Sequence, residues 1–265
     1  MAKKTYPSLL EQSEIRRLER RIEEHNEIVK SLSSHKKKIL DNFVDITWCY
    51  HEFAIEGVVL NHLEIKSALD DRIISNSDLI PNYFDVQAFY KGIQKVRKAG
   101  RKKRLTLTNN TIKQLHNIIT VSESNKDLVY RKEIPLHRQY AHDFSQPEKI
   151  PYKMRKLGDW LQSSTFRKMP ALMMAASIHN KLMSIFPWPN NSGSLARLVM
   201  NMILTYKNYP PAMIPAVERQ QYYDNIDMDL THDNDIQMVN FLSKTIFMYL
   251  DSIEKKLLQL KKDKI

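Results

Sequence analysis

Apolar residues recur at helical spacing along most of the chain, and this pattern predicts an all-α fold. Residues 9–32 carry a narrow apolar face between charged positions, and residues 39–54 carry a broader, aromatic-rich one. Gly57 follows the second pattern at the place where a left-handed residue ends a helix. The broad face predicts a packed helix. The narrow face is thin enough to pair with the chain's own core or with a second copy of the chain.

Further helical patterns follow, with one irregular stretch between them. Asn61 and Glu64 form a capping-box pattern that opens the first of these helices. The predicted helices cover residues 62–71, 85–98, 110–120, 171–186, 195–206 and about 235–260. A helix ending near 161 and another at 219–223 are implied only by the resemblance described below. Residues 129–144 lack helical period and alternate in polarity, which predicts a short β-hairpin with Pro135 on an edge strand.

Two long apolar helices meet at a turn that contains Pro187, Pro189 and several small polar residues. Ser192 or Ser194 is expected to cap the second helix, and Gly193 lets another group approach the backbone closely. The unpaired N–H groups at such a helix start attract anions. Taken alone, this sequence pattern is also typical of a capped helix in an all-helical core that binds no ligand.

The composition narrows the class of protein. A single cysteine, Cys49, excludes a disulfide framework and fits a reducing compartment, so a cytoplasmic location is expected. We find no secretory signal and no apolar run near the ~20 residues of a membrane span. His116 has no second ligand at metal spacing, so no metal site is expected.

The net charge of +11 comes from 41 basic and 30 acidic residues and is concentrated in runs. These runs are residues 36–38, 95–104 and 255–264, which read as solvated surface. Nucleic-acid binding through residues 95–104 is an alternative that rests on charge alone, because no aromatic residues are interleaved there.

Residues 170–204 resemble the signature region of the Fic family, whose pattern is His-Pro-Phe-x-Asp/Glu-Gly-Asn-Gly-Arg-x-x-Arg. Residues 186–197 here read Phe-Pro-Trp-Pro-Asn-Asn-Ser-Gly-Ser-Leu-Ala-Arg. The resemblance implies a Fic-type helical bundle with a β-hairpin flap, in which residues 1–84 form an N-terminal helical extension and residues 85–265 the Fic-like domain. The family's activity is the transfer of AMP from ATP to a protein hydroxyl.

Within this frame the resemblance places the base histidine of the family at Phe186, which cannot accept a proton. The loss of a general base costs ~10²–10⁴ in rate. The metal-holding acid is replaced by Asn190, so Mg²⁺ binding is doubtful. No intact catalytic residue is therefore expected. Weak binding of ATP is still expected. The implied nucleotide- or anion-binding positions are Asn190, Ser192, Gly193, Ser194 and Arg197.

Two further segments resemble parts of self-restrained Fic proteins. Residues 54–57 resemble the inhibitory-helix motif Ser/Thr-x-x-x-Glu-Gly/Asn, with Glu52 at the Ser/Thr position. The resemblance predicts an ion pair between the inhibitory Glu56 and Arg197. The second segment resembles the flap that receives a protein target as an added strand. Its implied residues are Tyr130, Arg131 and His142.

These observations support a pseudoenzyme that binds a protein partner through the flap and a nucleotide weakly. An alternative is an enzyme with altered Fic chemistry, a nucleotide-dependent transferase or hydrolase acting on a protein hydroxyl or a phosphate-linked adduct, with Glu56 or His142 as base. Many self-restrained Fic proteins associate, so a homodimer is also expected.

Overall fold

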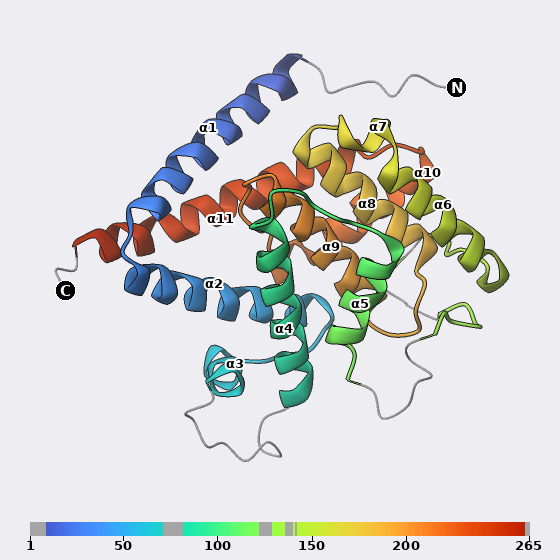
Figure 1. Ribbon diagram of the computed structural model, residues 1–265, viewed down its shortest axis with the longest axis horizontal. Coiled ribbons are helices and arrows are strands. Elements are labelled where there is room, and N and C mark those ends of the chain that lie inside the picture. The colour runs from blue at the N-terminus through green and yellow to red at the C-terminus, as the bar shows by residue number, and fades with distance from the viewer. Residues whose placement is uncertain (1–8, 71–81, 122–128, 136–139, 141, 263–265) are drawn as a thin grey trace.

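The computed structural model describes residues 9–70, 82–121, 129–135, 140 and 142–262, and these residues fold into packed helices (Figure 1). The all-helical prediction is confirmed. The helices are α1 (Leu9–Ser31), α2 (Ser34–Ile55), α3 (His62–Leu69), α4 (Tyr83–Gly100), α5 (Asn109–Ile119), α6 (Ile150–Gln162), α7 (Ser164–Arg167), α8 (Ala171–Ile185), α9 (Ser192–Tyr206), α10 (Arg219–Thr231) and α11 (Ile236–Lys262), with 3₁₀ turns η3 (Pro147–Lys149) and η4 (Ala216–Glu218). None of the helices in the described part of the chain combines the length and apolarity needed to cross a bilayer.

Helices α8 and α9 form the centre of the molecule. α8 packs against α9, α6, α10 and α11, while α4 and α5 cover another side of α9. All residues from Ser192 to Leu204 of α9 are buried, which follows from their nearly continuous apolar sequence. The N-terminus of α9 therefore begins inside the protein, where the α8–α9 turn delivers it.

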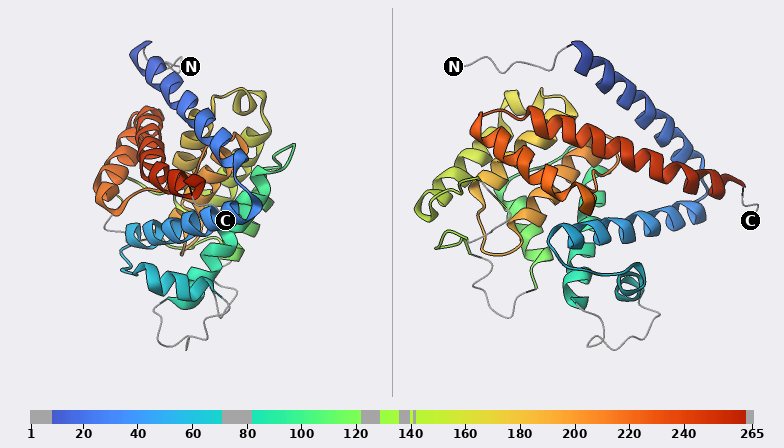
Figure 2. Two further views of the ribbon diagram at one scale, coloured as in Figure 1. Left: turned by 90° about the vertical axis from the view of Figure 1, so that its left-hand side faces the viewer. Right: turned by 180° about the vertical axis from the view of Figure 1, so that it is seen from behind.

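The N-terminal helices lie on this core from outside. α1 runs beside α11, and α2 packs against α3, α4 and α11 (Figures 1 and 2). In α1, Leu18 and Ile22 are buried, so the narrow apolar face is covered within the chain. The homodimer and the division between residues 84 and 85 stay predictions.

The end of α2 forms as its sequence predicts. Gly57 has a φ of 87°, and the N–H of Val58 reaches back to the carbonyl oxygen of Phe53 at 2.9 Å. Glu52 and Glu56 lie four residues apart and therefore share one face of the helix. The predicted capping box at Asn61 and Glu64 is also present, at the start of α3.

The predicted β-hairpin is wrong for the part of residues 129–144 that the structure describes, because no strand forms there. Arg131 is 5 % exposed and its guanidinium donates to the carbonyl oxygens of Phe186 at 2.6 Å and Glu133 at 2.8 Å. Its backbone N–H donates to the carbonyl oxygen of Pro187 at 3.0 Å. The segment is thus bound to the α8–α9 turn instead of to a second strand, and Pro135 supplies no N–H for a ladder. Residues 136–139 and 141 of the predicted hairpin lie outside the described residues.

Candidate functional site

The α8–α9 turn is compact and its rings are buried. Phe186 ends α8 in the left-handed region, with a φ of 45°, and its N–H donates to the carbonyl oxygen of Leu182 at 2.7 Å. Trp188 is fully buried and stacks on His116, with ring centroids 4.3 Å apart. His116 Nε2 lies 3.0 Å from the carbonyl oxygen of Asn190. His116 thus packs the turn against α5.

The start of α9 corrects one prediction. The residue at the N-cap is Asn191, with a φ of 58° and no side-chain cap hydrogen bond, so neither predicted serine caps the helix. Ser192 is instead the first helical residue. Its hydroxyl donates to the carbonyl oxygen of Trp188 and accepts from the N–H of Trp188, both at 2.9 Å. The serine side chain closes the turn and is not available to a ligand in this arrangement.

The predicted contact between Glu56 and Arg197 is present, and a second glutamate joins it. Glu52 accepts from Arg197 Nη2 at 2.6 Å and from Nε at 3.0 and 3.1 Å. Glu56 accepts from the same Nη2. Arg197 Nη2 also donates to the Ser194 hydroxyl at 3.3 Å. We call Arg197, Glu52 and Glu56 the Arg197 cluster. One guanidinium is matched there by two carboxylates from the end of α2.

Arg197 and Glu52 are buried, and the cluster is connected to the core. Burial opposes the charge of Arg197, but the nearby carboxylates of Glu52 and Glu56 outweigh it and hold the pKa of Arg197 well above its usual range. Arg197 Nη1 donates to the Tyr222 hydroxyl at 3.3 Å, and that hydroxyl lies 2.8 Å from His179 Nε2. The Arg197 cluster is therefore continuous with a polar network beneath α10.

Tyr140 covers the N-terminus of α9. A Cβ built at Gly193 would lie 2.6 Å from the Tyr140 hydroxyl oxygen, 3.2 Å from Glu56 Oε1 and 3.3 Å from Arg197 Nη1. Burial raises the pKa of Tyr140 well above its usual value, as does the charge of Glu56. The space that an anion would take beside Gly193 is thus filled by groups of the chain itself.

Aromatic rings surround Phe186. It is 2 % exposed, and its ring centroid lies 4.6 Å from that of Phe144 and 5.6 Å from that of Tyr140. Tyr140 also meets Tyr223 edge-on at 5.0 Å. The position assigned to the base histidine is therefore a buried phenyl ring within an aromatic cluster, and that ring accepts no proton.

Asn190 is exposed, and no carboxylate replaces it as a cation ligand at the turn. Among the described residues no group of three His, Cys, Asp or Glu side chains is arranged to hold a metal ion. With Arg197 already paired and Gly193 covered, the residues present do not fit Mg²⁺-bound ATP.

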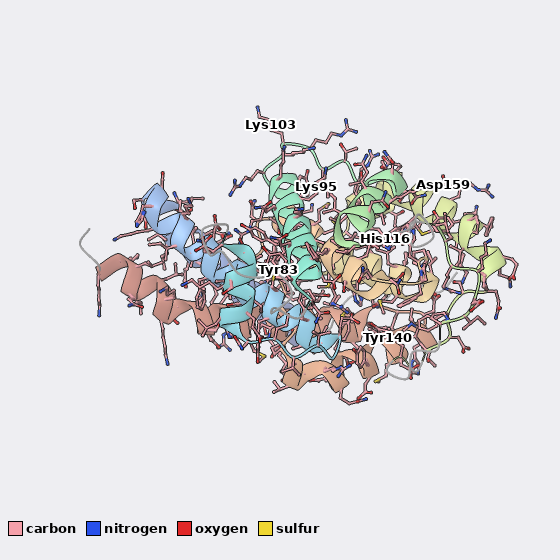
Figure 3. The ribbon with its side chains drawn as sticks, turned by 90° about the horizontal axis from the view of Figure 1, so that it is seen from below. Tyr83, Lys95, Lys103, His116, Tyr140 and Asp159 are labelled. Atoms are coloured by element: carbon pink, nitrogen blue, oxygen red, sulfur yellow. The ribbon has the colours of Figure 1, made fainter. Side chains whose placement is uncertain are left out.

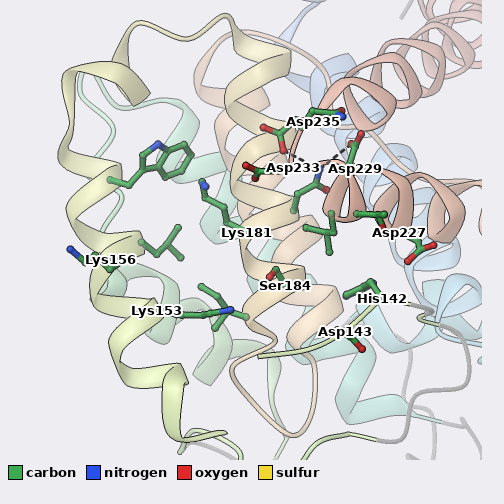
Figure 4. A pocket seen from close by; sticks show the side chains of 17 residues that line it. His142, Asp143, Lys153, Lys156, Lys181, Ser184, Asp227, Asp229, Asp233 and Asp235 are labelled. Atoms are coloured by element: carbon green, nitrogen blue, oxygen red, sulfur yellow. Dashed lines mark hydrogen bonds between the residues drawn. The ribbon is translucent and has the colours of Figure 1, made fainter. Parts of the chain in front are cut away.

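The other flap residues point elsewhere. Tyr130 is half-buried, with its ring 5.5 Å from that of Trp188. His142 is buried, its Nε2 lies 3.3 Å from the carbonyl oxygen of Met183, and burial lowers its pKa. It lines a pocket of about 590 Å³ between α6, α8 and α10, together with Lys153 and Asp227 (Figure 4). The proposal that Glu56 or His142 serves as a base stays a prediction.

The basic run at residues 95–104 lies away from this site. In Figure 3, Lys103 lies at the upper edge of the molecule and Tyr140 lies in its lower part. The residues from Arg101 to Arg104 are exposed, as expected for solvated surface.

Sequence reasoning missed three residues of the site. Glu52 has a recoverable signal, since it lies one helical turn before Glu56 on the same face of the helix. Tyr140 has none, because it falls in the stretch without period. Arg219, at the start of α10, packs its guanidinium 5.7 Å from the ring centroid of Tyr223, and its Nε donates to the Tyr223 hydroxyl at 3.3 Å.

The fold and the site define a helical protein in which the buried start of one helix is closed by an acidic helix end from the N-terminal segment. Residues 106–204 match the model of the Fic/DOC family, and this match supports membership of that family.

Relatives and solved structures agree with this assignment. Protein adenylyltransferase Fic of Drosophila willistoni is 26% identical over 208 residues, which cover 76% of this chain and 41% of that protein. The protein of the same name from Drosophila mojavensis is also 26% identical over 208 residues and is covered to 40%. The chain thus spans about two fifths of the length of these curated relatives.

Two solved structures show the same fold. A Fic domain containing signaling protein from Bacteroides thetaiotaomicron VPI-5482 superposes with a TM-score of 0.78 at 20% identity, covering 95% of this chain and 99% of that one. Fic-1 from C. elegans superposes with a TM-score of 0.74 at 18% identity, covering 95% of this chain and 72% of that one.

Proposed function

We propose that this Fic/DOC-family chain does not transfer AMP and acts as a pseudoenzyme that binds a protein partner. The observation that carries the proposal is Phe186, a buried ring at the position where the family resemblance places the general base. Phenylalanine accepts no proton, and a positioned base supplies ~10²–10⁴ of the rate.

The charges at the site support the same proposal. Catalysis of phosphoryl and nucleotidyl transfer depends on positioned cations that meet phosphate charge. Here Ser194 stands where the family has its first arginine, and Arg197 is matched by two carboxylates. A nucleotide would have to displace both before it gained any charge pairing.

The test is incubation of the purified chain with α-³²P-labelled ATP and Mg²⁺ or Mn²⁺, alone and with candidate target proteins. We expect no label on any protein above a heat-denatured sample. Protein adenylyltransferase Fic of D. willistoni, run in parallel, serves as the control for assay conditions. Incorporation by this chain within about tenfold of that enzyme would contradict the proposal, since the missing base alone costs more than that.

Residues 129–135, which we call the flap segment, support binding of a protein partner even though they form no strand. Val129 is 52% exposed and Ile134 is 48% exposed, although Arg131 between them is buried and fixes the backbone. Two large apolar side chains held outward on an anchored segment suit a protein interface. The proposed partner would cover these two residues.

Ile134→Asp should remove the partner in affinity purification followed by quantitative mass spectrometry. Val217→Asp is the matched control, because Val217 is 87% exposed on η4 and lies outside the flap. We expect one or more proteins to be retained by wild type and Val217→Asp and reduced about tenfold by Ile134→Asp. Identical sets of retained proteins for all three chains would refute a partner site on the flap.

A further inference from the structure

We propose that Glu52 keeps anions out of this site even when Glu56 is released, so that release of Glu56 alone does not open it. The inference rests on the proposed function, in which the start of α9 is a disabled phosphate site. It changes the role of α2 from a releasable inhibitory segment to a fixed closure.

The contacts favour Glu52 over Glu56. Glu52 pairs with Arg197 through both of its oxygens and reaches both Nε and Nη2, whereas Glu56 contacts only Nη2. The Glu52 side chain is 6% exposed and that of Glu56 is 34% exposed. Two-oxygen pairing with a guanidinium is the strong form of this contact, and it is the same form that a phosphate would need.

Glu52 also has nowhere to move. The cavity around it holds only about 10 Å³ and is walled by Trp48, Ile55 and Met213. That volume is at or below what one water molecule requires. Glu56, at the C-terminal end of α2, can turn toward solvent, but Glu52 has no open space to move into, since His51 and apolar side chains close the cavity around it.

The charge balance leads to the same result. The Arg197 cluster carries one positive and two negative charges, so a phosphate meets net negative charge. Removal of Glu56 brings the cluster to neutrality and leaves the pair of Glu52 with Arg197 intact. Only removal of Glu52 as well gives the site a free cation.

The experiment is calorimetric titration with inorganic tripolyphosphate of four chains that all carry Tyr140→Ala, so that the covering ring cannot mask the result. The first chain carries Tyr140→Ala alone. The second adds Glu56→Gly, the third adds Glu52→Gln, and the fourth adds both of these changes. We expect Glu56→Gly to change the affinity by less than about threefold. The chain with both changes should bind at least about tenfold more tightly, because the fraction of open sites sets the apparent affinity.

A second measurement reads the position of Arg197 without any ligand. In ¹⁵N NMR spectra the Arg197 Nε–H signal should stay in place in Glu56→Gly and move in Glu52→Gln. Asp45→Asn is the matched control, since Asp45 is a buried carboxylate of the same helix whose partner, at 2.7 Å, is Arg97. It should leave both the affinity and the Arg197 signal unchanged. Circular dichroism shows whether each variant is folded, and Glu52→Ser replaces Glu52→Gln if the latter is not.

The outcomes separate the two proposals. Glu56→Gly binding as tightly as the double change, or an unmoved Arg197 signal in Glu52→Gln, overturns the role of Glu52 and leaves the proposed function standing. Tight, Mg²⁺-dependent ATP binding by the unmodified chain overturns the proposed function itself.

Discussion

Replacing Arg197 with methionine is expected to lower the melting temperature by roughly 10 °C, the largest loss from any single substitution proposed for this chain. The change keeps the length and apolar volume of the side chain but leaves Glu52 and Glu56 without their cation. Removing one partner from a buried ion pair costs about 3–5 kcal/mol, because the remaining charge stays out of water.

The loss comes from the unpaired carboxylates, so it should be reversible. Adding Glu52→Leu and Glu56→Ala to Arg197→Met is expected to recover most of the melting temperature, since the buried charge is then gone. Arg97→Met is the matched control. Arg97 pairs with Asp41 at 3.0 Å and Asp45 at 2.7 Å but is 20% exposed, so its loss should be smaller.

Thermal unfolding followed by circular dichroism at pH 8 measures these effects while the carboxylates are ionised. A melting temperature of Arg197→Met within about 2 °C of wild type would mean that the Arg197 cluster contributes little to folding. Failure of the triple variant to recover would mean that the arginine side chain itself, and not its charge, is required.

Acidification is expected to destabilise the chain through His179. This residue is fully buried, with Nδ1 3.1 Å from Asn180 Oδ1 and Nε2 2.8 Å from the Tyr222 hydroxyl. Asn180 Nδ2 donates to Asp229 and Asp235, so the amide oxygen of Asn180 faces the imidazole of His179. Because that oxygen can only accept, the proton of His179 is on Nδ1. Nε2 then accepts from Tyr222. The network needs a neutral histidine.

Burial lowers the pKa of His179 from 6.5 to about 3, and the nearby charge of Arg197 acts in the same direction. In the unfolded chain the imidazole keeps its ordinary pKa near 6.5 and takes up a proton first. The stability contributed by neutral His179 is therefore complete above pH 6.5 and is lost as the pH falls toward 3. At pH 4.5 the expected loss is roughly 2–3 kcal/mol.

Urea unfolding at pH 7.0 and 4.5 measures this loss, and His179→Gln should show a smaller difference between the two pH values. The comparison is needed because other groups also titrate. Asp45, for example, has its pKa raised by burial to about 6, which favours the folded state as the pH falls. His232→Gln is the control, because His232, the C-cap residue after α10, is exposed. If His179→Gln keeps the full pH dependence of wild type, His179 does not carry the effect.

The order of the helices could be predicted because each one buries a face with helical spacing. Local signals also fixed details, such as the capping box of α3 and the left-handed Gly57 after α2. The contact of Glu56 with Arg197 came from the family resemblance, since no local pattern connects two residues 141 positions apart.

The rest depends on contacts between distant segments, which spacing does not encode. The alternation at residues 129–135 looked like a strand, but the guanidinium of Arg131 has its acceptors at the end of α8. Ser192 looked like a cap, but its hydroxyl is used within the α8–α9 turn. Glu52 departs from the inhibitory motif, and its meaning is apparent only when the second carboxylate is seen beside Arg197.

Gly193 matches the family signature, and in a working enzyme that glycine is explained by the close approach of a phosphate. In this chain the Tyr140 hydroxyl presses against the same backbone, and a methyl group there would overlap it. Packing against Tyr140 is thus by itself a reason for a glycine at this position. Agreement with the signature at Gly193 is accordingly no measure of whether a Fic protein still handles nucleotides.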